Sequence, residues 1–75
     1  MPKMNNFIIR DNVHGEILND NKPVPAANGK SALKKYRKMY PVMSTCMIEY
    51  TIENGNYHER TTIGGDLEAV PAKEV

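Results

Sequence analysis

The sequence has no tryptophan, one phenylalanine and one cysteine among its 75 residues. With Cys46 as its single cysteine, the chain can form neither an internal disulfide nor a zinc site built on cysteine pairs, which favours a reducing compartment. The longest apolar run is far shorter than a membrane span. The first twelve residues lack the basic-then-apolar order of a signal peptide. We therefore expect a cytoplasmic protein without membrane association.

Motifs of catalysis and metal binding are also scarce. His14 and His58 lie on different predicted elements, without the spacing of a metal site, and we expect both to be exposed polar residues. Cys46 and His58 fall on opposite faces of a predicted strand pair, so they do not form a nucleophile and base. The Gly-Lys-Ser at 29–31 lacks the upstream glycine of a phosphate-binding loop. The sequence thus predicts no enzyme, no metal, no cofactor and no small-molecule substrate.

The chain has the size and composition of one small globular domain. Hydrophobic residues make up 40% and charged residues 25%, which argues against wholesale disorder. A core of this size contributes only about 3–5 kcal/mol, and small domains often gain stability by self-association. We therefore expect residues 1–75 to form a single domain, with a homodimer as one means of stabilising it.

The first third of the chain predicts short β-structure followed by a loop. Phe7-Ile8-Ile9 is an apolar, β-branched run between polar residues, which is typical of a strand. A weaker run at 16–18 follows turn-forming residues, so 6–10 and 15–19 form either a hairpin or one irregular strand. Residues 19–29 contain two prolines, and we expect a loop there that no helix or central strand crosses.

Residues 30–40 give the clearest helical pattern. Ala32, Leu33, Tyr36, Met39 and Tyr40 recur at the spacing that places them on one face of a helix. Either Ser31 or Asn28 can cap the first free amides. Pro41 ends the helix because the residue before a proline is disfavoured in the α region.

Residues 45–63 predict a long β-hairpin. Apolar and polar residues alternate from Thr45 to Glu53, and Asn54-Gly55 is the preferred sequence for a two-residue type I′ turn. This turn places Ile52 opposite Tyr57, Tyr50 opposite Glu59, Glu49 opposite Arg60, Ile48 opposite Thr61 and Cys46 opposite Ile63. Ile48 and Ile52 then face the core and Glu49 forms a polar pair with Arg60.

Residues 1–5 and 66–75 are expected to be loose tails, the latter because Pro71 and mixed charge interrupt any pattern. The whole predicts an α+β fold of two layers, with one helix packed on a small antiparallel sheet in the order β(β)-α-β-β.

A basic segment gives one functional hypothesis. Residues 30–38 carry five cations and no acidic residue, whereas the C-terminal half is acidic. A basic helix face binds phosphates, so nucleic acid is a candidate partner, although cations on the wet side of a helix are commonly just solvated. The predicted contact residues are Lys30, Lys34, Lys35, Arg37 and Lys38.

An open sheet edge gives the other hypothesis, which we rank slightly higher. A sheet this small leaves an unpaired edge that can accept a strand from another protein or from a second copy. The strand at 45–53 is long, and flexible methionines are adaptable contact residues. The predicted edge residues are Met43, Thr45 and Met47. The sequence therefore favours a non-catalytic binding module, acting through protein interaction or self-association.

Overall fold

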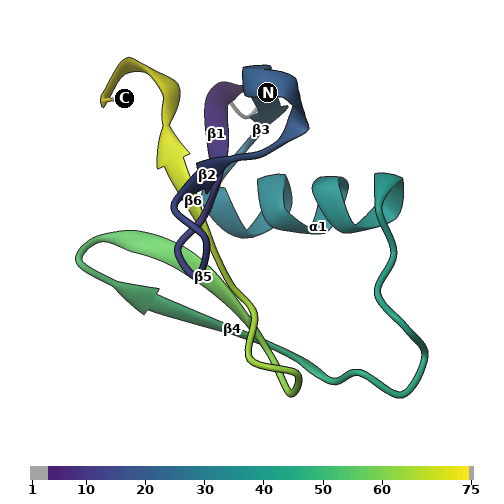
Figure 1. Ribbon diagram of the computed structural model, residues 1–75. Helices are drawn as coiled ribbons and strands as arrows, with labels where there is room; N and C mark the ends of the chain where they lie inside the picture. Colours follow the sequence, from purple (N-terminus) through teal and green to yellow (C-terminus); the bar gives the residue numbers. More distant parts are fainter. Residues whose placement is uncertain (1–3, 75) are drawn as a thin grey trace.

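The computed structural model describes residues 4–74 and contains one helix packed on one antiparallel sheet (Figure 1). The predicted α+β architecture is therefore confirmed. The sheet order is β2-β1-β6-β5-β4, and β3 pairs with the other half of the β1 edge that β2 occupies. The elements are β1 (Asn5–Asp11), β2 (Glu16–Ile17), the 3-10 turn η1 (Asn19–Asn21), β3 (Val24–Ala26), α1 (Gly29–Met39), β4 (Ile48–Glu53), β5 (Asn56–Thr61), β6 (Asp66–Pro71) and the 3-10 turn η2 (Ala72–Glu74).

The predicted loose tail at 66–75 is wrong for most of its length. Residues 66–71 form β6, which pairs with β1 on one side and with β5 on the other. Leu67, Ala69 and Val70 are buried. The short alternation of Leu67 and Ala69 toward the helix is enough for a strand once both neighbouring strands supply hydrogen bonds. Pro71 is tolerated because it stands at the end of the strand.

The predicted loop at 19–29 is also partly wrong. Residues 24–26 form β3, whose Val24 and Ala26 are buried while Pro25 is exposed. Proline has no backbone N–H to donate to a ladder, and β3 lies at a sheet edge, where only one side is paired. The expectation that no central strand crosses this segment is consistent with that position. The N-terminal hairpin alternative is confirmed by the pairing of β1 with β2.

Before β3, the turn η1 has an unusual backbone. Asn19, Asp20 and Asn21 have φ values of 59°, 53° and 62°, all in the left-handed region. Asparagine and aspartate enter this region more readily than other non-glycine residues. Their short polar side chains thus allow the chain to reverse between β2 and β3 without glycine.

The helix α1 lies where the 30–40 pattern predicts it. Asn28 is the cap, because its side-chain oxygen accepts a 2.8 Å hydrogen bond from the Ser31 amide. Ala32, Leu33 and Tyr36 are buried as expected. Met39 and Tyr40 are about half exposed, at 52% and 49%. The apolar face therefore contributes to the core only along its first turns.

The predicted hairpin register is confirmed from Ile48 opposite Thr61 to Ile52 opposite Tyr57. The predicted pair of Cys46 with Ile63 is wrong, because β4 begins at Ile48 and β5 ends at Thr61. Asn54 and Gly55 have φ values of 54° and 83°, as a type I′ turn requires. The polar pair differs from expectation. Arg60 lies opposite Glu49, yet its guanidinium forms ion pairs with Glu53 and Asp66.

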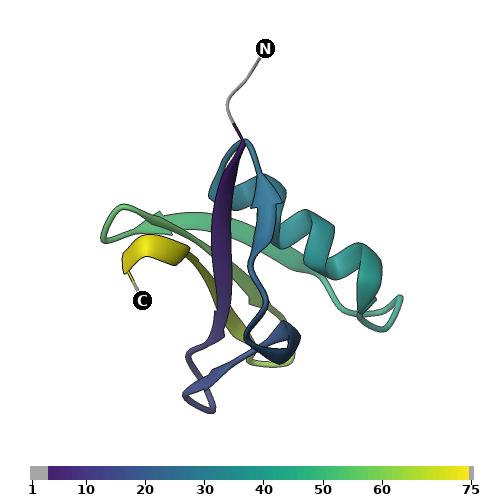
Figure 2. The same cartoon turned by 90° about the horizontal axis from the view of Figure 1, so that it is seen from above.

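The core lies farther from this hairpin than the sequence suggested. The helix packs against β1, β3, β5 and β6, as the two views show (Figures 1 and 2). Ile52 was expected in the core but is 60% exposed, because β4 is the outermost strand. The buried cluster consists of Phe7, Ile9, Val24, Ala26, Ala32, Leu33, Tyr36, Leu67 and Ala69, with Leu18, Tyr50 and Tyr57 partly buried against it.

Removing one methyl group tests this placement of the core. Ile9 is fully buried on β1, whereas Ile63 is 70% exposed in the turn after β5. We expect Ile9→Val to lower the free energy of unfolding by about 1 kcal/mol, because it removes a buried methyl group. The matched Ile63→Val should change it by less than about 0.5 kcal/mol. Urea denaturation followed by circular dichroism measures both, and equal losses would contradict the core described here.

Candidate functional site

The five cationic side chains that were predicted to contact nucleic acid do not lie on one surface of the protein. Lys30 and Lys34 project toward the hairpin, where their ammonium groups lie 5.7 and 5.9 Å from the centre of the Tyr50 ring. Lys35 donates a 2.5 Å hydrogen bond to the Pro25 carbonyl on the β3 side. Lys38 borders a hollow on that same side. The basic segment is therefore divided between two sides of α1, which weakens a single phosphate-binding stripe.

Arg37 is the fifth cation, and it is neutralised within the protein. Its Nε donates a 2.6 Å hydrogen bond to Oε1 of Glu59, a residue of β5 with no exposed surface. Burial raises the pKa of Glu59, while the hydrogen bond and charge of Arg37 lower it; burial prevails. The second carboxylate oxygen, Oε2, accepts no hydrogen bond from the described residues 4–74. Arg37 is therefore needed to hold a buried carboxylate and is not free to bind phosphate.

The Arg37–Glu59 pair predicts a pH-dependent effect of substitution. Arg37→Met leaves a buried carboxylate without its partner, and we expect it to lower the free energy of unfolding at pH 7 by about 3–5 kcal/mol. The folded-state pKa of Glu59 lies above its ordinary 4.5, so the penalty grows as pH rises through that folded pKa. As pH falls toward 4.5 and below, Glu59 takes up a proton and the loss should shrink.

The double variant Arg37→Met/Glu59→Gln is the control, because it removes both charges from the same site. Its free energy of unfolding at pH 7 should exceed that of Arg37→Met alone. Urea denaturation at neutral and acidic pH gives both comparisons. A loss in Arg37→Met that stays constant with pH would show that the carboxylate is not the cause.

A second buried carboxylate, Glu68 on β6, lies on the sheet face away from α1 and is 5% exposed. It accepts hydrogen bonds from Asn56 (2.9 Å), Arg10 (2.5 Å) and Asn12 (3.2 Å). Burial raises the pKa of Glu68, but the three hydrogen bonds together outweigh burial and lower it. In Glu68, hydrogen bonding prevails over burial and favours the charged form, whereas in Glu59 burial prevails.

His58 belongs to the same arrangement, although the sequence predicted an exposed histidine. It is 6% exposed, its Nδ1 lies 3.0 Å from Asp66 and its Nε2 lies 3.6 Å from Glu68. The expectation failed because β6, taken for a tail, brings both acids alongside β5. Within residues 4–74, no three His, Cys, Asp or Glu side chains are placed to hold a metal ion. The arrangement is an internal ion and hydrogen-bond network.

The predicted edge residues require a correction. The strand was expected to begin at Thr45, but β4 begins at Ile48. The Cys46 amide donates to the Met43 carbonyl at 2.9 Å, which closes a turn and takes Met43 and Thr45 out of the ladder. Met47 meets the end of β5, since its carbonyl accepts from the Thr62 amide at 3.2 Å. Met43 and Met47 are 67% and 73% exposed but lie before the edge strand.

The outer edge of β4 is the candidate site that remains. In a two-residue hairpin the residues that flank the turn are a hydrogen-bonded pair, so Glu53, Thr51 and Glu49 direct their amides and carbonyls to β5. The carbonyl of Met47, two residues before Glu49, also points toward the β5 side, as this alternation requires. The backbone groups of Ile48, Tyr50 and Ile52 therefore point outward. No other strand of residues 4–74 lies beyond β4 (Figure 1).

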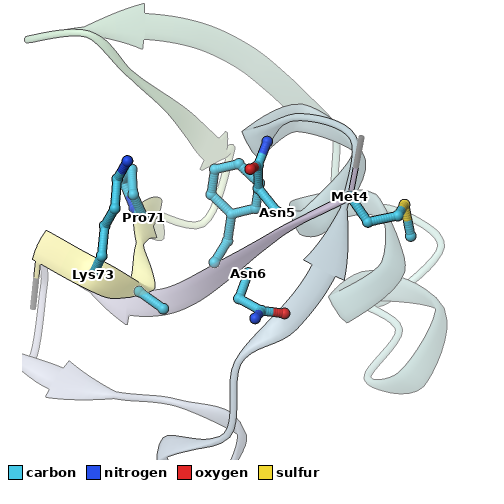
Figure 3. Close-up of a pocket in the computed structure, with 7 residues that line it drawn as sticks. Met4, Asn5, Asn6, Pro71 and Lys73 are labelled. Atoms are coloured by element: carbon cyan, nitrogen blue, oxygen red, sulfur yellow. The ribbon is translucent and has the colours of Figure 1, made fainter. Parts of the chain in front are cut away.

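A hollow of about 420 Å³ lies between the first residues of β1 and the last residues of β6, away from the β4 edge (Figure 3). Its lining residues are Met4, Asn5, Asn6, Phe7, Pro71, Ala72 and Lys73. Lys73 supplies the one charged side chain of that lining. A small-molecule site combines enclosure with several convergent polar groups, so this hollow does not indicate a particular ligand.

Comparison with known proteins adds no relative: no family model matches the chain, and no curated protein or solved structure is significantly similar to it. In the part of the chain that the structure describes, α1 is the single α-helix, and it is too short and too polar to cross a membrane.

Proposed function

We propose that this protein is a non-catalytic binding module that accepts an extended strand of a protein partner along the outer edge of β4. The observation that carries the proposal is the outward backbone of Ile48, Tyr50 and Ile52, which no other strand of residues 4–74 pairs. Each such residue offers one amide and one carbonyl to an added strand. The same three side chains lie on the helix side of the sheet, where Ile52 is 60% exposed. Apolar surface and free backbone groups thus coincide along one strand.

The acidic residues of β4 support a selective edge. Glu49 and Glu53 project from the opposite face, and charges beside an open edge discourage indiscriminate strand pairing. Arg60 already pairs with Glu53, so the selectivity rests on Glu49, and an added strand must place a neutral or basic side chain opposite that residue. The edge offers an apolar row on one face and acidic side chains on the other, and this combination restricts the sequences that fit.

A proline at an outward-facing position tests the proposal. Ile52→Pro removes an amide that points away from β5, and edge positions tolerate proline, so the hairpin should remain folded. Ile52→Thr is the matched control, since it shortens the side chain but keeps the amide. We expect proteins captured by the immobilised wild type to be retained by Ile52→Thr and lost by Ile52→Pro, with circular dichroism confirming equal folding. Identical capture by all three chains would refute strand addition at β4.

Nucleic-acid binding is the second candidate, because Lys30 and Lys34 flank the Tyr50 ring and neither forms an ion pair with any residue of 4–74. Cations beside an aromatic ring suit single-stranded nucleic acid, whose bases stack on such rings. Lys38, on the β3 side of α1, supplies a third cation for phosphates.

Salt dependence distinguishes this candidate. If Lys30, Lys34 and Lys38 each contact a phosphate, the logarithm of the binding constant for single-stranded DNA should fall with log salt concentration at a slope of about −2. Lys30→Gln/Lys34→Gln should lower that slope by more than one, whereas Lys35→Gln should leave it unchanged. Fluorescence anisotropy with a labelled oligonucleotide measures each slope. Absence of binding at about 50 mM salt would eliminate this candidate.

A further inference from the structure

We infer that the strand accepted by β4 is β4 of a second copy, paired antiparallel with Tyr50 on the two-fold axis. This inference rests on the function proposed above and names its partner. It follows from the pattern of side chains on β4, because an antiparallel pair of identical strands allows only a few registers and their charges differ.

Geometry limits the choice of register. A two-fold axis through the paired strands keeps each side chain on its own face of the sheet, so a residue can lie opposite only a residue of the same face. An axis at either end of Ile48–Glu53 pairs little of the strand, so the residue on the axis is Glu49, Tyr50, Thr51 or Ile52. A register centred on Ile52 pairs Tyr50 with Asn54 of the turn and shortens the ladder, which leaves three registers that use the length of β4.

Charge separates the remaining three. A register centred on Glu49 places that carboxylate opposite its own copy. A register centred on Thr51 places Glu49 opposite Glu53 of the second copy, twice. Like charges directly opposite each other destabilise a sheet. Only the register centred on Tyr50 avoids both contacts, because there Glu49 faces Thr51.

The register centred on Tyr50 also matches the apolar side chains. On the helix side, Ile48 lies opposite Ile52 of the second copy, and the two-fold axis repeats this pair on the other side of Tyr50. The exposed side chain of Ile52 is thereby covered. The outward backbone groups of all three residues enter the new ladder. One register thus satisfies hydrogen bonding, apolar burial and charge together.

The space beside β4 allows a second copy to approach. The helix makes its main contacts with β1, β3, β5 and β6, and no other strand of residues 4–74 pairs with the outer side of β4. Two copies joined at this edge form one continuous sheet with a helix on the same face of each half. A single strand pair buries a small area, so we expect a weak dimer that forms at high micromolar concentration.

Site-specific crosslinking tests the register. In a Cys46→Ser background, Glu49→Cys and Thr51→Cys are made as two separate chains. The proposed register makes residues 49 and 51 a non-hydrogen-bonded pair, about 4.5 Å apart at Cα, which is within disulfide range. Under mild oxidation we expect the mixture to form a disulfide heterodimer, identified by intact mass, while each chain alone stays uncrosslinked.

The controls identify the competing registers. Glu49→Cys crosslinks with itself only if the axis passes through residue 49, and Thr51→Cys only if it passes through residue 51. Either result overturns the register centred on Tyr50. Equal crosslinking in all three samples indicates random collision and also overturns it.

Charge at position 51 gives a second test that needs no disulfide. Thr51→Lys places a cation opposite Glu49 of the second copy, so we expect a dissociation constant about threefold lower than wild type at low salt. Thr51→Glu places an anion there and should raise it about threefold. Sedimentation from about 10 µM to about 1 mM covers this weak range. Lack of any difference between the two variants contradicts the register.

The outcome also separates this inference from the broader function. A chain that stays monomeric throughout, yet captures a partner in an Ile52→Pro-sensitive manner, overturns the second copy as occupant and leaves the strand-addition function standing. Loss of both properties removes the two proposals together.

Discussion

The pairing of β6 with strands on both of its sides is the constraint on which the rest of the structure depends. It joins the N-terminal strand β1 to the hairpin of β4 and β5, and without it these two units share no ladder. Side chains alternate along β6, so Leu67 and Ala69 point to the helix and Glu68 points to the opposite face of the sheet. Both the apolar core and the internal ion network are therefore built on one six-residue strand.

Local patterns in the sequence were sufficient for the elements that fold on local information. The helix and its end, the Asn54-Gly55 turn and the register of β4 against β5 were all predictable, because periodicity and turn chemistry act over a few residues. β6 was not predictable in this way. The alternation of polar and apolar residues covers only Asp66 to Ala69, between Gly64-Gly65 and Pro71, so it is too short to distinguish a strand from a tail until its two neighbours are known.

The candidate site was predictable in kind but not in position. An open edge on the hairpin followed from the small size of the sheet, yet the edge begins at Ile48 because Met43 and Cys46 form a turn. The buried Glu59 was within reach of sequence analysis. The predicted register placed it opposite Tyr50 on the core face, where a carboxylate requires a cation from the layer above, and Arg37 lies on that helix. The role of His58 depended on β6 and could not be anticipated.

The two-residue turn at Asn54-Gly55 also has a consequence for the order of assembly. Its two strands are adjacent in sequence and can close within microseconds, whereas β1 and β6 must meet across most of the chain. Both edges of the hairpin are therefore unpaired early in folding, and the β5 edge later pairs with β6 of the same molecule. During that interval a neighbouring molecule can supply the missing strand, so refolding at high concentration favours exchange of β6 between chains.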